Sequence, residues 1–154
     1  VKTTGARHRV NLISAINQRG AMRFMVTEDN VNSSVFITFL KRLIAGASQP
    51  IFLIIDNHPV HRSTEVRDFV KNTQGKLRLF YLPPYSPELN PDEHVWNYLK
   101  NHKIGRQTTK NGWELYKRVD GIMRSLQKLP CKIQSFFKHP LTKYTLMFGN
   151  QCTA

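Results

Sequence analysis

The sequence predicts an α/β fold in which helices cover a mixed β-sheet. Segments with strand character alternate with segments whose apolar residues recur at helical spacing, a pattern typical of such sheets. Residues 51–55, Ile-Phe-Leu-Ile-Ile, form a continuous apolar run typical of a strand buried on both faces. The 154 residues, 40% of them hydrophobic, are enough for one core, and neither a repeat nor a linker interrupts them. We therefore expect a single domain spanning residues 1–154.

Four segments are expected to form strands. Residues 9–16 and 22–27 are rich in branched residues and flank a turn at 17–20, which predicts a hairpin. The apolar run at 51–55 is the third strand, and residues 77–82 form the fourth.

Five further segments carry apolar residues at helical spacing. We expect helices over 32–46, over 63–72, from Asn90 onward, over 111–129 and over 133–138. Asn32 or Ser33 can cap the first of these helices, and Gly46 can close it.

The charge of the chain indicates a polyanionic partner. Lys and Arg number 23 against 10 Asp and Glu, a net charge of +13, and residues 1–27 and 121–154 contain no acid. Neutralising phosphates releases their condensed counterions, so this excess favours DNA as the partner. The alternative is a basic surface that only keeps the protein in solution.

The sequence predicts neither a membrane span nor a signal peptide. No apolar run approaches the roughly 20 residues that a membrane helix needs, and the amino end is basic and polar. We therefore expect a protein of the cytoplasm. Cys131 and Cys152 match no metal-binding spacing and are expected to stay reduced and inert.

Asp56 directly follows the most apolar strand. The loops that leave the carboxyl ends of strands are where α/β sheets place their sites. Residues 56–62 read Asp-Asn-His-Pro-Val-His-Arg, which gathers an acid, an amide and two imidazoles within seven residues. Asp56 and Asn57 could simply cap a turn. The density of polar groups favours a site, in which His61 could orient a carboxylate or contact a phosphate.

Glu93 ends a proline-rich connection. Residues 82–93 read Leu-Pro-Pro-Tyr-Ser-Pro-Glu-Leu-Asn-Pro-Asp-Glu. A capping box formed by Asn90 and Glu93 is an adequate structural explanation of the acid. It does not explain the prolines that stiffen the approach to the helix. Rigid placement of a helix start suits a carboxylate that must meet a metal ion closely.

These two motifs together resemble the DDE transposases of mariner-related bacterial insertion sequences. The proline-rich segment that ends in Asn-Pro-Asp-Glu and continues to Trp96 is the most specific part of the resemblance. Weaker similarity, at residues 3–7, 35–40 and 136–144, extends it over nearly the whole chain.

The resemblance implies a ribonuclease H-like fold with three acids on neighbouring elements. Asp56 matches the second acid and Glu93 the third, with 36 residues between them. In the complete site these acids would hold two Mg²⁺ or Mn²⁺ ions, about 3.5–4 Å apart, for attack on DNA phosphodiesters. We expect Asn57 and His61 to support the two carboxylates. Asp92 and Glu88 match no catalytic position.

The chain departs from the family pattern at its amino end. In the family the first acid lies on a strand that precedes the hairpin at residues 9–27, and a helical region that binds transposon ends lies further upstream. Neither is found here, and no acid precedes Glu28. We therefore expect the sheet to lack its first strand and this chain alone to be inactive. The chemistry would belong to a longer parent protein.

Basic residues near the two motifs are candidates for phosphate contacts, which position DNA without reading its sequence. They are Arg62, Lys100, Lys103, Arg106 and Lys110. The alternative is a solvated helix end and loop.

The resemblance implies cleavage at transposon ends and attack of the freed 3′ hydroxyl on target DNA. The full-length protein would act as a homodimer on the bacterial nucleoid. Two alternatives stay open. One is a non-catalytic DNA-binding remnant of a transposase, and the other is a ribonuclease H-like nuclease that cuts without joining.

Overall fold

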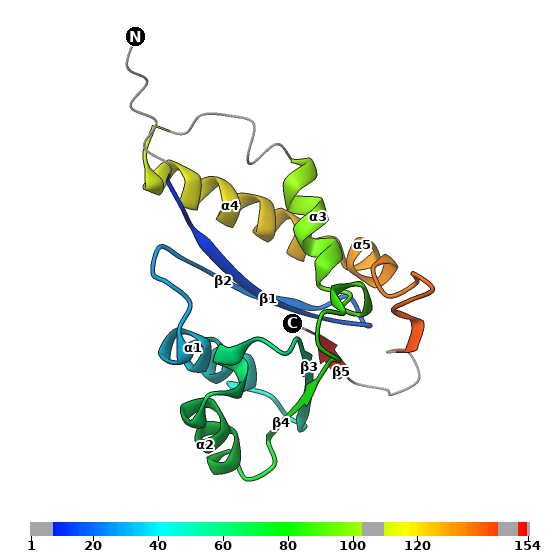
Figure 1. The fold of residues 1–154 in the computed structure, drawn as a ribbon. Helices are drawn as coiled ribbons and strands as arrows, with labels where there is room; N and C mark the ends of the chain where they lie inside the picture. Colours follow the sequence, from blue (N-terminus) through cyan, green and yellow to red (C-terminus); the bar gives the residue numbers. More distant parts are fainter. Residues whose placement is uncertain (1–7, 103–109, 145–150, 154) are drawn as a thin grey trace.

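The computed structural model describes residues 8–102, 110–144 and 151–153 (Figure 1). Their elements are β1 (Asn11–Asn17), β2 (Met22–Thr27), α1 (Ser33–Ile44), β3 (Ile51–Ile55), the 3₁₀ turn η1 (Pro59–Arg62), α2 (Thr64–Asn72), β4 (Leu77–Tyr81), the 3₁₀ turn η2 (Pro87–Leu89), α3 (Glu93–Asn101), α4 (Gly112–Gln127), α5 (Pro130–Ser135) and β5 (Gln151–Thr153).

One mixed sheet runs through the molecule in the order β2-β1-β5-β3-β4. β1 pairs antiparallel with both β2 and β5, whereas β3 pairs parallel with β5 and β4. The sheet therefore has an antiparallel half and a parallel half, and β5 joins them.

Helices cover both faces of the sheet, α1 and α2 on one side and α3, α4 and α5 on the other (Figure 1). The alternation of side chains along β1 explains this arrangement. Leu12 and Ile16 pack into the core beneath α3, α4 and α5, while Ala15 packs into the core beneath α1 and α2. Each core is apolar and well buried, so the predicted α/β architecture with a mixed sheet is confirmed.

Most elements begin and end within two residues of the bounds predicted from local signals. Asn32 caps α1 by accepting the Val35 N–H, and Ser63 caps α2 by accepting the Val66 N–H. The hairpin turn also lies where it was predicted, with the Gly20 N–H donating to the Asn17 carbonyl at 3.0 Å. The fifth helix was predicted three residues late. It begins at Pro130, a residue type that is favoured in the first turn of a helix.

β5 was not predicted, and it occupies the centre of the sheet. Only three residues long, it pairs with the last two residues of β1 and with Phe52 to Ile54 of β3. The first residues of β1 extend beyond this pairing. The position between β1 and β3 is therefore only partly filled by the described residues.

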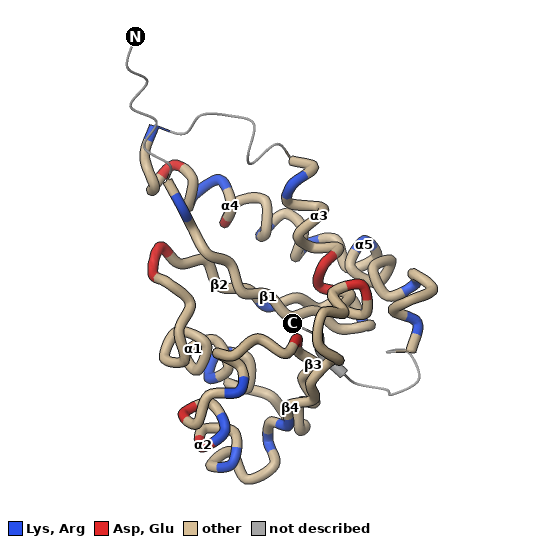
Figure 2. Tube along the Cα trace, viewed as in Figure 1, with Lys and Arg blue, Asp and Glu red and all other residues tan. Residues whose placement is uncertain are grey.

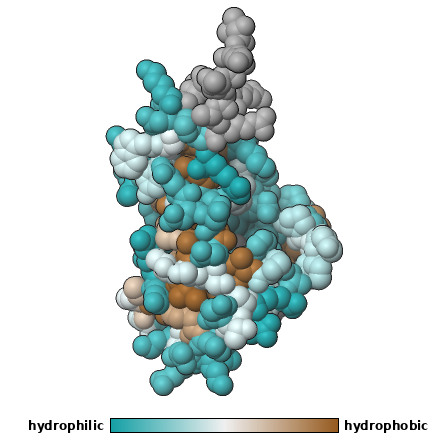
Figure 3. Space-filling model, turned by 60° about the vertical axis from the view of Figure 1, so that its left-hand side comes forward, coloured by the Kyte–Doolittle hydropathy of each residue, from teal (hydrophilic) through white to brown (hydrophobic). Residues whose placement is uncertain are grey.

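No helix in the described part of the chain is long and apolar enough to cross a membrane. Hydrophilic residues cover most of the face shown in Figure 3, with apolar residues in short patches between them.

Candidate active site

Asp56 is held where the buried strand β3 ends. Leu53 and Ile55 are fully buried, and Ile55 pairs with Tyr81 in β4. The Leu82 N–H continues the ladder by donating to the Ile55 carbonyl at 2.8 Å. Asp56 is therefore the first side chain to leave the sheet, with its backbone fixed on the strand side.

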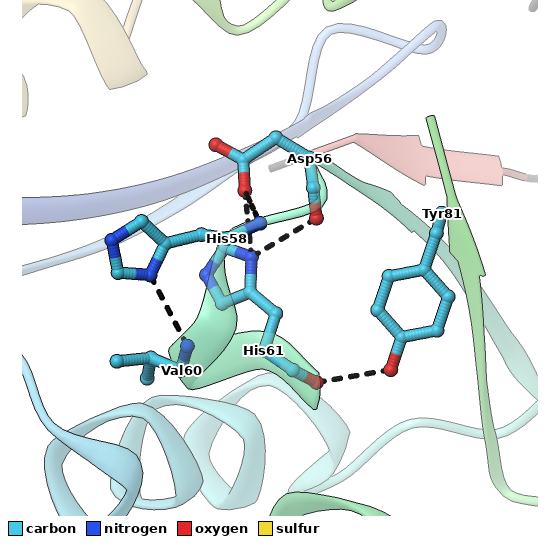
Figure 4. A network of polar contacts seen from close by, with 5 residues as sticks. All are labelled: Asp56, His58, Val60, His61 and Tyr81. Atoms are coloured by element: carbon cyan, nitrogen blue, oxygen red, sulfur yellow. Dashed lines mark hydrogen bonds and ion pairs between the residues drawn. The ribbon is translucent and has the colours of Figure 1, made fainter. Parts of the chain in front are cut away.

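The loop after β3 folds back onto the Asp56 carboxylate (Figure 4). Oδ1 of Asp56 accepts a hydrogen bond from the His58 N–H at 3.0 Å and lies 2.9 Å from Nδ1 of His61. A carboxylate can only accept, so Nδ1 of His61 carries the proton. The His61 ring lies against Phe36 of α1, and Tyr81 donates to the His61 carbonyl at 2.9 Å.

This network stabilises the ionised form of Asp56. The hydrogen bond from His61 lowers the pKa of Asp56 below its usual value. Partial burial raises this pKa, and the hydrogen bond from the His58 N–H lowers it further. The side chain stays 56% exposed. In the described part of the chain no donor reaches Oδ2, so one carboxylate oxygen faces outward.

Glu93 stands at the start of α3, beyond a connection that backbone bonds hold in place. The Leu89 and Asn90 N–H groups donate to the Ser86 and Pro87 carbonyls. Tyr144 donates to the Leu89 carbonyl at 2.7 Å. The end of the proline-rich segment is thereby tied to the body of the protein.

The capping box that offered a structural explanation of Glu93 does not form. The Asn90 side chain accepts the Asp92 N–H at 3.0 Å, and the Asn90 N–H donates to Pro87 rather than to Glu93. The helix begins at Glu93 after two turn residues. Because the Asn90 N–H bonds to the Pro87 carbonyl, a capping box does not account for Glu93.

Asp56 and Glu93 line one cavity of about 490 Å³. We call it the carboxylate cavity; its lining is Asp56, Asn57, His58, Pro59, Leu82, Pro83, Pro84, Tyr85, Ser86, Pro87, Asn90 and Glu93. Partial burial raises the pKa of Glu93, Lys100 opposes the rise, and the charge of Asp56 adds to it. The two carboxylates therefore interact electrostatically across the cavity.

The donor atoms in the carboxylate cavity suit a hard divalent cation. Asp56 offers its outward oxygen, and the mutual repulsion of Asp56 and Glu93 would be relieved by a cation. Asn57 Oδ1 is buried and has no hydrogen-bond partner among the described residues. No group of three or more His, Cys, Asp or Glu side chains in the described ranges is arranged to hold a metal ion.

A second acid beside Glu93 faces the opposite way. Asp92 is buried, and Ser14 Oγ of β1 lies 2.9 and 2.8 Å from its two carboxylate oxygens. Burial raises the pKa of Asp92 well above its usual value; the Ser14 hydrogen bond opposes this, and the charge of Glu93 adds to it. The protonated acid can donate to Ser14 and accept from it, so Asp92 ties the start of α3 to the sheet.

Asp92→Asn is expected to flatten the pH dependence of stability. Above the ordinary pKa of 3.8 the unfolded chain releases the Asp92 proton, whereas the folded chain retains it up to its raised pKa. The free energy of unfolding therefore falls as pH rises through that window, by at most about 1.4 kcal/mol per pH unit. The measurement is urea unfolding of both proteins across pH with EDTA present. Parallel curves for the two proteins would refute the assignment.

The structure brings only some of the predicted basic residues near the cavity. Lys100, on α3, acts on the Glu93 carboxyl. Arg62 ends η1, with its guanidinium 5.1 Å from the Tyr81 ring centre. Lys110 precedes α4 and does not line the cavity; its N–H donates to Glu114 at 2.7 Å. Lys103 and Arg106 lie outside the described residues.

Figure 2 shows Lys or Arg on every α-helix and acids where β3 ends and α3 begins. The carboxylate cavity is therefore an acidic position in a basic protein. A metal ion between the acids would leave the surroundings suited to a polyanion.

The family model described as DDE superfamily endonuclease matches residues 1–115, about three quarters of the chain. The chain belongs to the DDE superfamily endonucleases. An insertion element IS630 uncharacterized 39 kDa protein of Shigella sonnei is 30% identical over 132 residues, which cover 84% of this chain and 38% of that protein. The uncharacterized protein y4pE/y4sA of Sinorhizobium fredii is 32% identical over 83 residues, 54% of this chain and 58% of that protein.

The chain thus spans less than two thirds of the length of these two relatives. Among solved structures, the catalytic domain of Mos1 mariner transposase aligns with a TM-score of 0.63 at 15% identity. The alignment covers 90% of this chain and 74% of that one. The predicted ribonuclease H-like fold is confirmed. Membership of the DDE superfamily endonucleases, the broader family that contains the predicted DDE transposases, is confirmed as well.

Proposed function

We propose that this chain is part of a transposase that cleaves DNA at the ends of an insertion sequence and joins the freed ends to target DNA. The observation that supports it most is the meeting of Asp56 and Glu93, from separate elements, in one cavity of a DDE endonuclease fold. Residues 1–154 would act as one catalytic domain. The full-length protein would work as a homodimer on DNA of the bacterial nucleoid.

In this proposal Asp56 and Glu93 hold the divalent ions, Mg²⁺ or Mn²⁺. When bound, two such ions activate the attacking oxygen and stabilise the leaving oxygen of a phosphodiester. His61 and the His58 N–H hold the Oδ1 oxygen of Asp56, so that Oδ2 keeps one orientation. Asn57 would add its buried oxygen to the ligand shell or to a bound water.

Cleavage would consume water and leave a 3′ hydroxyl and a 5′ phosphate. Joining would form a new bond between that 3′ hydroxyl and a target phosphate, with release of a target 3′ hydroxyl. Lys100 and Arg62 would hold the phosphates on either side. Neither step needs an oxidant or a nucleotide.

We further propose that the first acid of the set comes from a strand in the position that β5 partly fills. β5 runs parallel to β3, and Thr153 is level with Ile54. A strand that continues past this level would bring its next residues beside Asp56. An acid there would complete a set of three carboxylates.

The presence of only two acids at the cavity among the described residues favours a second candidate, DNA binding without chemistry, for this stretch alone. A cleavage assay with Mg²⁺ or Mn²⁺ separates the candidates. We expect this chain to leave labelled DNA intact and a chain extended toward the length of its relatives to cut and join it. Cutting without joined product would instead indicate a nuclease.

Binding of this chain to duplex DNA should be weak, independent of sequence and strongly dependent on salt. Each neutralised phosphate adds about 0.9 to the slope of log affinity against log salt, so three contacts weaken binding roughly 40-fold between about 50 and 200 mM salt. Fluorescence anisotropy measures this slope. Replacing Arg62 and Lys100 with Ala should reduce it by about two. A flat salt dependence would show that the charge serves another purpose.

A further inference from the structure

Tyr85 is an aromatic side chain that the fold itself does not use. Five large hydrophobic side chains are exposed among the described residues: Phe80, Tyr85, Trp113, Leu129 and Leu141. Tyr85 is the most exposed of them, at 101% of its reference area, and of the five it alone lines the carboxylate cavity. Burial in the core therefore does not explain a tyrosine here.

The backbone at Tyr85 is also unfavourable for a bulky residue. Its φ of 55° lies in the left-handed region, which glycine or asparagine occupies with less strain. Pro83, Pro84 and Pro87 restrict the flanking backbone, and Ser86 Oγ donates to the Pro84 carbonyl at 3.2 Å. A rigid loop thus holds a strained, exposed ring beside Asp56 and Glu93, a combination that points to a role in function.

We propose that Tyr85 stacks on an unpaired base of the DNA strand whose phosphate reaches Asp56 and Glu93. The proposal rests on the proposed function and makes Tyr85 a positioning residue. Every base offers a flat face, so an aromatic ring holds a strand without sequence preference. Lys and Arg attract duplex and single strands alike, whereas Tyr85 contacts only a base that has left the stack. The substrate at the cavity is therefore DNA that is locally unpaired.

The test compares a duplex carrying a single-stranded 3′ extension with a blunt duplex, in EDTA so that neither is cut. Tyr85→Ala should weaken binding of the extended duplex about fivefold or more, as loss of one stacked base predicts. Binding of the blunt duplex should change by less than about twofold, and Tyr85→Phe should bind both like the wild type. A 2-aminopurine in the extension should be quenched by the wild type and not by Tyr85→Ala.

Two control variants separate stacking from other causes. Trp113→Ala removes another exposed ring, on α4 and outside the cavity. It should not change the ratio of the affinities for the extended and the blunt duplex. Tyr85→Gly relieves the backbone strain, so its Tm should equal or exceed that of the wild type. Its binding of the extended duplex should be weakened as much as that of Tyr85→Ala.

Equal weakening on both DNAs, or no weakening by Tyr85→Ala, would overturn the proposal. So would a loss of self-association in sedimentation with DNA binding unchanged, which would assign the ring to a second copy of the chain. Because these measurements contain no metal ion, a failure of the Asp56 and Glu93 site would not alter their outcome.

Discussion

Asp56→Asn and Glu93→Gln should each abolish DNA cleavage by a chain extended to include the first acid. Each change removes a carboxylate from the ion-binding set, and metal ions supply several kcal/mol of transition-state stabilisation. A loss of about 4 kcal/mol corresponds to roughly a thousandfold lower rate. The measurement is the rate of cleavage of a labelled transposon-end duplex in Mg²⁺.

DNA affinity should survive both substitutions, because removing a negative charge does not weaken attraction to phosphates. The matched control is Glu88→Gln, which alters an exposed acid in the same segment but outside the carboxylate cavity; it should cleave at nearly the wild-type rate. If extended Glu93→Gln also cut at that rate, Glu93 would have no part in the chemistry.

Leu53→Ala is expected to lower the free energy of unfolding by about 2–5 kcal/mol. Leu53 is fully buried in the core that β3 shares with α1 and α2, three residues before Asp56. Such a loss is a large part of the roughly 5–15 kcal/mol that stabilises a typical domain. Urea unfolding followed by circular dichroism measures it.

The same substitution at an exposed position provides the control. Leu141 is 47% exposed, and Leu141→Ala should cost well under half as much. If Leu53→Ala unfolded at the same urea concentration as the wild type, β3 would not be the rigid support of Asp56 that we describe.

The parts of the fold that local chemistry determines could be predicted from the sequence. Asn32 and Ser63 cap their helices because a side-chain oxygen at that position satisfies a free N–H, whatever lies elsewhere. β5 could not be predicted in this way. Its three residues carry no periodic pattern, and only pairing with β1 and β3 makes them a strand.

The two acids of the candidate site could be predicted from the sequence, but the residues that pack around the site could not. Asp56 and Glu93 were found from the buried strand and the proline-rich segment. The pairing of Ser14 with Asp92 joins residues 78 positions apart, so it left no local signal. The same holds for Phe36 and Tyr81, which position His61 from other elements. The positive φ of Tyr85 was equally invisible, although the exposed ring follows two prolines.

Whether Asp56 and Glu93 bind one divalent ion together can be measured on this chain by NMR. A trace of Mn²⁺ added to ¹⁵N-labelled protein broadens the amide signals of residues near the ion, even where binding is weak. We expect the amides of His58 and His94 to broaden together and before those elsewhere, and Asp56→Asn or Glu93→Gln to abolish both effects while Glu88→Gln abolishes neither. Broadening at His94 that persists in Asp56→Asn, or broadening that never reaches His58, would contradict a shared site.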